Sequence, residues 1–499
     1  MPSRALATDS ALHTPLCDLL GCRHPLMLAG MGGISRSDLV VAVSEAGGFG
    51  FLGMARESPA LIRAELELVR SRTRALFGVS LVPAATPARL LREQLALCVE
   101  LAVPVVGLFW DVDQEVVARL RAAGIVVVHQ VGSAVEALLA QEAGAQLLIA
   151  QGVEAGGHVR GQKPLRQLLP EVLAVAHVPV AAAGGLVDGR DVARVLDQGA
   201  QAAVLGTVFV ATQESYAHDY YKQRLVQARA EDAVLSEDFH LNWPSHARVR
   251  VLASSVTRGE RGDSRASRLQ VIGEESGRPV YLFGTDSPLR STTGDFEAMA
   301  LYAGQGVGRI NQLEPAGRCL QRILGEAVAH WRLIHEDEME LSSPVCYAAD
   351  VERDRNASLI VRLDELLAAE RAGARVALRS LAESSDPVLR KVLDAMHRDA
   401  VRWCAMLMQA IRRLKGQPGM RTGAFYEQAM AVPDLHKRLA LLNHGQNWVI
   451  RKLCELLVMV EDPGLRQELG DMQQAHENNQ LRVASLLESQ GRGPDMGLS

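Results

Sequence analysis

Short apolar runs alternate with amphipathic stretches through the first 210 residues of the chain. The apolar runs contain few polar positions, which is typical of parallel strands that are covered on both faces. They lie at 25–29, 49–53, 76–81, 103–109, 125–131, 145–150, 178–183 and 202–210. Between them, apolar residues recur at helical spacing in stretches such as 37–45, 59–72, 87–101, 114–122, 133–143 and 189–198. Eight strands that each lead to a helix or its equivalent predict a (β/α)8 TIM barrel.

An open, doubly wound α/β sheet would explain the local alternation equally well. Such a sheet rarely contains eight consecutive units without a change of strand order, and the first strand-to-helix turn lacks a G-x-G-x-x-G fingerprint. The pattern therefore favours the closed barrel. In that fold, the residues that perform chemistry lie in the loops that follow the carboxyl ends of the strands.

Four of these predicted strand ends are rich in glycine. They lie at 29–33, 151–158, 183–185 and 206–207. Glycine lets a flat ligand approach the backbone, and the loops after strands 7 and 8 of barrels commonly bind phosphate. His158 follows two glycines directly and is the candidate acid/base residue. The alternative interpretation, tight turns that merely need glycine, explains one such loop well but explains four on one rim poorly.

Beyond about residue 336 only helical periodicity remains. Charged segments around a Ser-Ser-Pro turn predict a linker at 336–357. Four long amphipathic runs follow, at about 358–383, 387–413, 434–460 and 464–488. Two short connections and one long crossover are typical of a ferritin-like four-helix bundle, predicted here over 358–490 with a flexible tail at 491–499. The first domain then covers 1–335, and its irregular segment 213–335 is predicted to elaborate the mouth of the barrel.

Each predicted bundle helix carries a polar residue near the middle of its apolar seam. The set consists of Glu370, Asp394, His397, Gln446, Gln473 and His476. It resembles a degenerate form of the Glu and Glu-x-x-His ligands of di-iron bundles. Only two of the four carboxylates are present, and two carboxylates balance two iron ions poorly. A metal site on the two carboxylates and the two histidines therefore competes with a buried hydrogen-bond network that fixes the helix register.

Composition narrows the range of partners. A formal net charge of −5 and an aromatic content of 4% give no indication of nucleic-acid binding. The seven cysteines are scattered and form no C-x-x-C pair, which is typical of a reducing cytoplasm. No apolar run approaches about 18 residues, so neither a membrane span nor a signal peptide is predicted. We expect a cytoplasmic protein that acts on a small molecule. The sequence is compatible with a homo-oligomer.

Taken together, these motifs resemble the FMN-dependent nitronate monooxygenase family, formerly called 2-nitropropane dioxygenases. The matching segments fall between about residues 15 and 330, at 25–33, 42–50, 77–81, 151–158, 182–190, 205–214, 221–222 and 303–306. Flavin-dependent enoyl-acyl-carrier-protein reductases and some NAD(P)H:quinone reductases share the barrel and many of the motifs. The resemblance implies an FMN-dependent oxidoreductase. Its substrate would be a nitronate, with O2 as redox partner, or an enoyl or quinone compound, with NAD(P)H. The other alternative is a barrel that binds flavin without turnover, with the bundle as an interaction module.

The resemblance also implies a set of FMN-binding residues. They are Ala29, Gly30, Met31, Ser80, Gln151, Gly156, Gly157, Ala183, Gly184, Gly185, Gly206, Thr207 and Gln305. Those from Gly184 to Thr207 would hold the phosphate, and those from Ala29 to Met31 would lie near the isoalloxazine ring. Ser80 stands where the family usually has asparagine, and Val159-Arg160 displaces a glycine that usually follows the histidine motif. We therefore expect the substrate side to differ from that of relatives.

His158 matches the family's active-site histidine near the reactive nitrogen of the flavin. A protonated imidazole would stabilise an anionic nitronate, whereas a neutral imidazole can remove a proton from the carbon of a nitroalkane. In a reductase, the same group would donate a proton to an enolate. Electron transfer would belong to the flavin, and the protein would supply placement and exclusion of water.

Overall fold

The computed structural model describes residues 12–263, 269–334 and 348–489. Contacts within the chain divide it into two compact units, a barrel unit and a helical unit, with the main boundary after Ile334. In the described part of the chain, no helix combines the length and the apolar character needed to cross a membrane.

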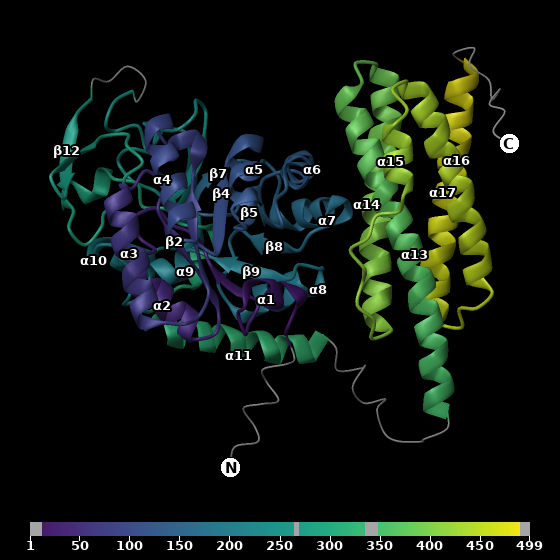
Figure 1. The fold of residues 1–499 in the computed structure, drawn as a ribbon, viewed down its shortest axis with the longest axis horizontal. Coiled ribbons are helices and arrows are strands. Elements are labelled where there is room, and N and C mark those ends of the chain that lie inside the picture. Colours follow the sequence, from purple (N-terminus) through teal and green to yellow (C-terminus); the bar gives the residue numbers. More distant parts are fainter. Residues whose placement is uncertain (1–11, 264–268, 335–347, 490–499) are drawn as a thin grey trace. The chain divides into compact units, whose positions relative to one another are not determined.

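Eight parallel strands close into the barrel of the first unit (Figure 1). In order around the barrel they are β1 (Leu26–Leu28), β2 (Phe49–Gly53), β3 (Phe77–Leu81), β4 (Val105–Phe109), β5 (Val126–Val131), β6 (Leu147–Gln151), β8 (Val180–Ala183) and β9 (Ala202–Leu205). Each strand lies within or overlaps one of the eight apolar runs, so the predicted fold class is confirmed. The eighth strand is shorter than its apolar run because the chain turns at Gly206 into the short helix α9 (Thr207–Val210).

Apolar side chains fill the interior of the barrel. The cluster contains Met27, Phe49, Phe51, Val105, Val128, Leu147, Ile149, Ala181, Ala183, Ala202 and Val204. Leu16 and Leu20 of α1 (Pro15–Leu20) belong to the same cluster and are fully buried. Helix α1 therefore packs onto the core of the barrel, and the carboxyl ends of the strands remain for a site.

Helices surround the barrel. They are α2 (Ser37–Glu45), α3 (Pro59–Arg72), α4 (Ala88–Glu100), α5 (Gln114–Ala122), α6 (Ala134–Ala143), α7 (Leu165–Val175), α8 (Gly189–Asp197) and α11 (Ala316–Ile334). Side chains of Ser58, Asp113, Ser133 and Asp188 cap four of them by accepting a first-turn backbone N–H. Helix α11 packs against α2 and α8. The predicted elaboration at 213–335 is thus too long, because its last part is a helix of the outer ring.

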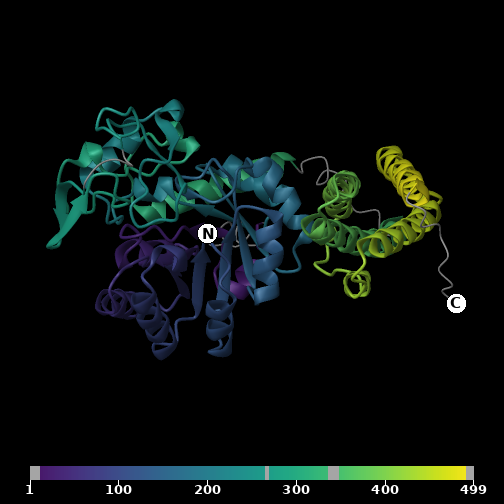
Figure 2. The same cartoon turned by 90° about the horizontal axis from the view of Figure 1, so that it is seen from above.

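The segment between β9 and α11 forms the elaboration, and Figure 2 shows it gathered on one side of the barrel unit. It contains α10 (Asp219–Gln227), β10 (Ala233–Ser236), β11 (Arg248–Leu252), β12 (Val271–Glu275), β13 (Arg278–Tyr281), β14 (Thr293–Gly294) and the 3-10 helix η4 (Gln305–Arg309). Strand β12 pairs with β13 and β14. Strand β11 pairs with β10 and, on its other edge, with β7 (Gly157–Val159) from the loop after β6. The hydrophobic pattern does not predict β7, since three residues are too few to show an alternation.

The second unit consists of long helices. They are α13 (Ala348–Glu383), α14 (Pro387–Arg413), α16 (Leu435–Leu457) and α17 (Pro463–Ser489), with the short α15 (Phe425–Met430) in the crossover. Helix α13 packs against α14 and α16, and α17 packs against the same two helices. This is the four-helix arrangement that the sequence predicts, whereas the ferritin-like relationship stays a prediction.

The beginning of α13 differs from the prediction. The helix is already present at Ala348, inside the predicted linker at 336–357. Residues 336–347 of that linker and the predicted tail at 491–499 lie outside the described residues. The charged stretch 350–356 had indicated a linker, but charged residues are also good helix formers when a helix face is solvated.

Candidate functional site

A cavity of about 440 Å³ lies at the carboxyl ends of the barrel strands. Its volume falls in the range of about 300–1,000 Å³ that is typical of ligand sites. The predicted residues that line it are Ala29, Gly30, Met31, Ser80, Gln151, Gly156, Gly157, His158, Ala183, Gly184, Gly185, Gly206 and Thr207. The structure therefore brings together all but one of the residues predicted for the barrel site.

The exception is Gln305. Its side chain is exposed and does not line the cavity. Its backbone N–H donates to the carbonyl of Glu154 at 3.0 Å, while Gly304 and Gly306 form part of the cavity wall. The segment around η4 thus reaches the site through backbone, and also through Tyr302, rather than through the glutamine side chain.

The glycines of the site fall into two groups. A Cβ on Gly30 would lie 2.2 Å from the Cβ of Ser80, and one on Gly156 would lie 2.7 Å from the backbone nitrogen of Gly304. These two glycines allow one part of the chain to pack against another. By contrast, a Cβ on Gly157 would meet no atom within 4 Å, and one on Gly206 would meet nothing closer than 3.7 Å. Bare backbone with room for a ligand therefore lies at Gly157 and Gly206.

The loops after β8 and β9 form another part of the wall. Gly184 and Gly185 have φ angles of +127° and +68°, a region that other residues seldom adopt. The hydroxyl of Thr207 accepts a hydrogen bond from the backbone N–H of Gly304 at 3.0 Å. Gly304 in turn packs against Gly156, so the loops after β6 and β9 are held together by the elaboration.

His158 lies on β7, opposite Val249 of β11. Its side chain is only 6% exposed, and its ring stacks on the indole of Trp243 with a centroid distance of 3.6 Å and an interplanar angle of 9°. The pKa of His158 is lowered to about 3, mainly by burial and also by the charge of Arg56, while the backbone carbonyl of Phe239 acts in the opposite direction. The imidazole is therefore neutral at neutral pH.

Two buried polar atoms in the wall have no hydrogen-bond partner among the described residues. They are Nε2 of His158 and Oε1 of Gln151. The other side-chain atom of Gln151, Nε2, donates to the backbone carbonyl of His158 at 3.0 Å. An unpaired buried polar atom costs about 1–3 kcal/mol. Because both residues line the cavity, a bound molecule can supply the missing partners.

The loop that carries His158 is held from two sides. The buried guanidinium of Arg250 donates to the carbonyl of Val153 through Nε at 3.1 Å and Nη2 at 2.8 Å, and to the carbonyl of Ala233 at 3.0 Å. The carboxylate of Glu154 accepts the backbone N–H of Leu165 at 2.9 Å. These contacts fix the loop before any ligand binds.

The sequence patterns miss part of the site. Trp243 and Tyr302 lie in segments expected near the mouth, but no local pattern indicates that they contact His158. Arg56 lines the cavity and gave no signal beyond its place after the second apolar run. Arg160, expected on the substrate side, instead pairs with Asp111 and Glu136 at 3.0 and 3.2 Å and does not line the cavity.

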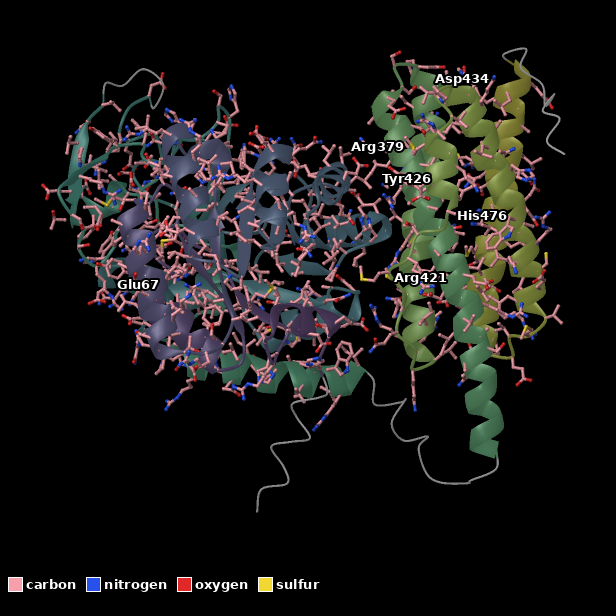
Figure 3. All side chains as sticks on the ribbon, in the orientation of Figure 1. Glu67, Arg379, Arg421, Tyr426, Asp434 and His476 are labelled. Carbon is pink, nitrogen blue, oxygen red and sulfur yellow. The ribbon has the colours of Figure 1, made fainter. Side chains whose placement is uncertain are left out.

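The residues predicted to bind metal in the helical unit do not come together as one set. Nε2 of His476 lies 3.2 Å from Oε1 of Glu370 without the alignment of a hydrogen bond, and its Nδ1 contacts Oε1 of Gln446 (Figure 3 labels His476). Nδ1 of His397 instead contacts the carbonyl of Ala374 at 3.1 Å, and Asp394 pairs with Arg398 at 3.1 Å with its side chain 48% exposed. Among the described residues, no group of three or more His, Cys, Asp or Glu side chains is placed to hold a metal ion. The structure therefore does not support the predicted metal site. It agrees better with the alternative, a buried network of polar contacts between the helices.

A closed barrel with a buried histidine beside a ligand-sized cavity at its strand ends defines the class of TIM-barrel enzymes. Within that class, residues 13–326 match the family model described as nitronate monooxygenase. The chain belongs to this family and is a flavin oxidoreductase, as the resemblance predicted. Residues 357–485 match a second model, described as a domain of unknown function, DUF6306.

Relatives with different names match the barrel unit. One from Rhodococcus jostii (strain RHA1), named (3aS,4S,5R,7aS)-5-hydroxy-7a-methyl-1-oxo-octahydro-1H-indene-4-carboxyl-CoA dehydrogenase, is 36% identical over 46% of this chain and 63% of its own length. A protein of the same name from Mycobacterium tuberculosis is 30% identical over 64% of this chain and 97% of its own. A probable nitronate monooxygenase from Staphylococcus aureus is 26% identical over 62% and 96% of the two chains.

Solved structures that resemble this chain also have different names. FabK from Thermotoga maritima superposes with a TM-score of 0.57 at 28% identity and covers 65% of this chain and 99% of its own. A nitroalkane oxidase from Streptomyces ansochromogenes gives a TM-score of 0.53 at 30% identity and covers 64% and 99%. The similarity therefore spans more than one named activity on one fold.

Proposed function

We propose that the barrel unit binds FMN and oxidises alkyl nitronates with O2. The observation that carries this proposal is the state of His158. The imidazole is buried, neutral and stacked on Trp243, and its Nε2 has no partner in a cavity lined by the predicted FMN residues.

The residues present fit FMN. Gly184, Gly185, Gly206 and Thr207 would hold the phosphate, because they line the cavity and two of them have the φ angles of glycine-only turns. The unpaired Oε1 of Gln151 offers an acceptor to an N–H group of the flavin ring. When bound, FMN supplies the electron transfer, which no side chain of the site can perform alone.

The state of His158 also favours one substrate over another. A group with a pKa of about 3 is a weak base and is poorly suited to remove a proton from carbon at neutral pH. A nitronate has already lost that proton, so its oxidation needs no base, and the neutral histidine would only help to orient it in the cavity. Trp243 holds the ring in one plane and, with Tyr302, limits the access of water.

A second candidate is an oxidoreductase that acts on an acyl thioester or a quinone with NAD(P)H. The cavity wall continues beyond His158 to Arg278 and Tyr281 of β13, which gives a longer substrate a path past the flavin position. The names of the Rhodococcus and Mycobacterium relatives, and the enoyl reductase relationship predicted from the sequence, point to such substrates.

Anaerobic mixing separates the two candidates. The purified full-length protein is mixed with propionate 3-nitronate, NADH or NADPH while flavin absorbance is recorded. We expect bleaching by the nitronate. Rapid bleaching by NADH or NADPH, with no response to the nitronate, would replace this proposal by the second candidate. A colourless protein that takes up no added FMN would contradict both.

A cytoplasmic location belongs to the same proposal. Six cysteines in the described part of the chain are free, at positions 17, 22, 98, 319, 404 and 454, as expected in a reducing compartment. Labelling of thiols in intact cells and in extracts, with the same extent of modification, would support it.

A further inference from the structure

We propose that Arg56 binds the anionic group of the substrate beside His158 and selects planar oxyanions such as a nitronate or a carboxylate. The inference rests on the proposed function of the same cavity. It adds a substrate-binding residue and the charge that this residue requires of the substrate.

The first observation is the position of Arg56. It follows β2, lines the cavity, and has a φ angle of +59°, which is uncommon for a residue other than glycine. Such conformations are stabilised only by the surrounding structure and concentrate at functional sites. The backbone there directs a long cationic side chain along the cavity, and the side chain remains 25% exposed.

The second observation is a chain of contacts from Arg56 to His158. Nη2 of Arg56 donates to the hydroxyl of Thr285 at 2.8 Å. The backbone carbonyl of Thr285 accepts the hydroxyl of Tyr302 at 2.6 Å, and the ring of Tyr302 lies 6.0 Å from the ring of His158. The guanidinium therefore lies on the same part of the wall as the histidine. In agreement, the charge of Arg56 adds to the burial that lowers the pKa of His158, and it opposes the burial that raises the pKa of Tyr302.

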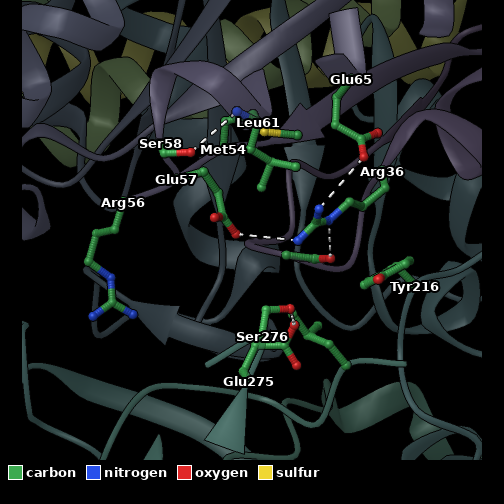
Figure 4. Close-up of polar contacts among 12 residues, drawn as sticks. Arg36, Met54, Arg56, Glu57, Ser58, Leu61, Glu65, Tyr216, Glu275 and Ser276 are labelled. Atoms are coloured by element: carbon green, nitrogen blue, oxygen red, sulfur yellow. Dashed lines mark hydrogen bonds and ion pairs between the residues drawn. The ribbon is translucent and has the colours of Figure 1, made fainter. Parts of the chain in front are cut away.

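The third observation is that no acid in the described residues accepts a hydrogen bond from Arg56. The carboxylate of Glu57 lies 3.6 Å from Arg36 and 3.9 Å from Arg278, and in Figure 4 Arg56 extends away from the Arg36–Glu57 pair. Asp286 forms an ion pair with Arg56 at 3.8 Å, a distance too long for a hydrogen bond, and its side chain is 44% exposed.

Glu275, the remaining acid in this part of the wall, is satisfied by hydroxyl groups. Its carboxylate accepts Ser276 at 3.0 Å and Ser291 at 2.6 Å, and it also contacts Thr292. A guanidinium has five N–H donors. Among the described residues, those of Arg56 have one hydrogen-bond acceptor, the neutral hydroxyl of Thr285. Asp286 balances part of the charge of Arg56, but most of the N–H donors of the guanidinium have no acceptor within the described ranges and are available to a ligand.

The chemistry of the ligand follows from the shape of the donor. A guanidinium is planar and matches two oxygens of one planar group, as a carboxylate or a nitronate presents them. A neutral nitroalkane lacks the full charge that would repay desolvation of the arginine, so the site prefers the ionised form.

The test uses inorganic nitrate, a planar oxyanion without a reactive carbon, titrated into flavin-loaded full-length protein by calorimetry. Arg56→Met removes the charge and keeps the length of the side chain, whereas Arg56→Lys keeps the charge without the fork. We expect nitrate affinity to fall about 10- to 100-fold in Arg56→Met, as for loss of a hydrogen bond to a charged group, and to fall less in Arg56→Lys.

Two arginines provide matched controls. Arg63 on α3 is paired with Glu100 at 2.6 Å and does not line the cavity, and Arg278 lies in the wall with its side chain 60% exposed. Arg63→Met should leave nitrate affinity unchanged. Unchanged affinity in Arg56→Met, loss only in Arg278→Met, or no binding of nitrate to the wild type would overturn the inference.

Flavin absorbance separates this inference from the proposed function. If Arg56→Met retains flavin and loses nitrate, the inference holds whichever redox partner the enzyme uses. A wild type that holds flavin but does not respond to nitronate would contradict the proposed function. Normal nitrate binding in Arg56→Met would contradict the inference about Arg56, and the two measurements are independent. As a second readout, the KM for propionate 3-nitronate should rise in Arg56→Met more than kcat falls.

Discussion

His158 in the barrel unit and His476 in the helical unit are both buried, and they differ in what surrounds their ring nitrogens. His158 in the barrel unit is 6% exposed, and its Nε2 has no partner among the described residues. His476 in the helical unit is 4% exposed, but Glu370 lies 3.2 Å from its Nε2 and Gln446 contacts its Nδ1. In the described part of the chain, neither Nε2 has a well-aligned hydrogen bond, but that of His158 lies in the wall of the cavity, whereas that of His476 lies against the carboxylate of Glu370.

This difference separates a site from a structural network, although both contain buried polar side chains. The cavity around His158 keeps two unpaired polar atoms next to bare backbone at Gly157. In the helical unit, Asn479 and Asp399 form a further pair at 2.8 Å, which adds to the links between helices. Buried polar groups that satisfy each other can fix helix register, whereas unsatisfied ones in a cavity indicate binding.

The largest expected effect comes from His158→Asn. Asparagine retains polarity but cannot stack in the same position against Trp243. We expect kcat/KM for the nitronate to fall about 10²-fold, because the substrate loses a group that positions it. The flavin content, measured by absorbance, should stay at the wild-type level. Unchanged kinetics would remove the distinction between the two histidines.

Glu370→Ala tests the structural role of the polar network around His476 in the helical unit. Removing one member of a buried pair typically costs about 3–5 kcal/mol, because the other member remains buried without its partner. We expect the transition of the helical unit in calorimetry to move to lower temperature, with kcat/KM unchanged. Glu370→Gln, which keeps the shape and an acceptor, should lose less. A loss of turnover in Glu370→Ala without loss of stability would show that the network has a functional role.

The pH dependence of stability sharpens the comparison further. The ordinary pKa of histidine is 6.5, and that of buried His158 is lowered to about 3, so between these values the unfolded chain binds more protons. The stability that depends on neutral His158 is therefore complete above about pH 6.5 and is lost as the pH falls. Between about pH 7.5 and 5, we expect the wild type to lose about 2 kcal/mol more than His158→Asn. Equal losses in urea unfolding at the two pH values would contradict the burial of a neutral ring.

The smallest expected effect is that of metal removal. Because the predicted ligands do not converge, dialysis against a chelator should leave the unfolding temperature of the helical unit unchanged. Metal analysis of the wild type beside the Glu370→Ala/His397→Ala double variant provides the control. Stoichiometric metal that is present in the wild type and absent from the double variant would restore the metal interpretation.

The barrel could be predicted from the sequence because each of its elements has a local signature. Each strand is a short apolar run, and helices such as α3 and α5 have the predicted bounds because their periodicity and caps lie within the same few residues. Because the strands are parallel, their glycine-rich carboxyl ends all lie on the same rim of the barrel. For the same reason, nearly all of the predicted FMN residues line one cavity.

What could not be predicted depends on contacts between distant segments. The stack of Trp243 on His158 requires β7 to pair with β11, and the contact of Arg56 with Thr285 joins two loops far apart in the sequence. No local periodicity encodes such pairs. The predicted metal ligands lie apart for a related reason, because seam position places Asp394 near the core, whereas its pairing with Arg398 turns it toward solvent.

The pairing of β7 with β11 also bears on how the chain can change over evolutionary time. The residue expected to meet the substrate belongs to a small antiparallel sheet, two of whose three strands come from the insertion between β9 and α11. Substitutions in that insertion can reposition His158 and its aromatic neighbours while the cofactor bed on the barrel rim stays as it is. New substrates can therefore arise in this fold by rebuilding one insertion, without redesign of the eight-stranded scaffold.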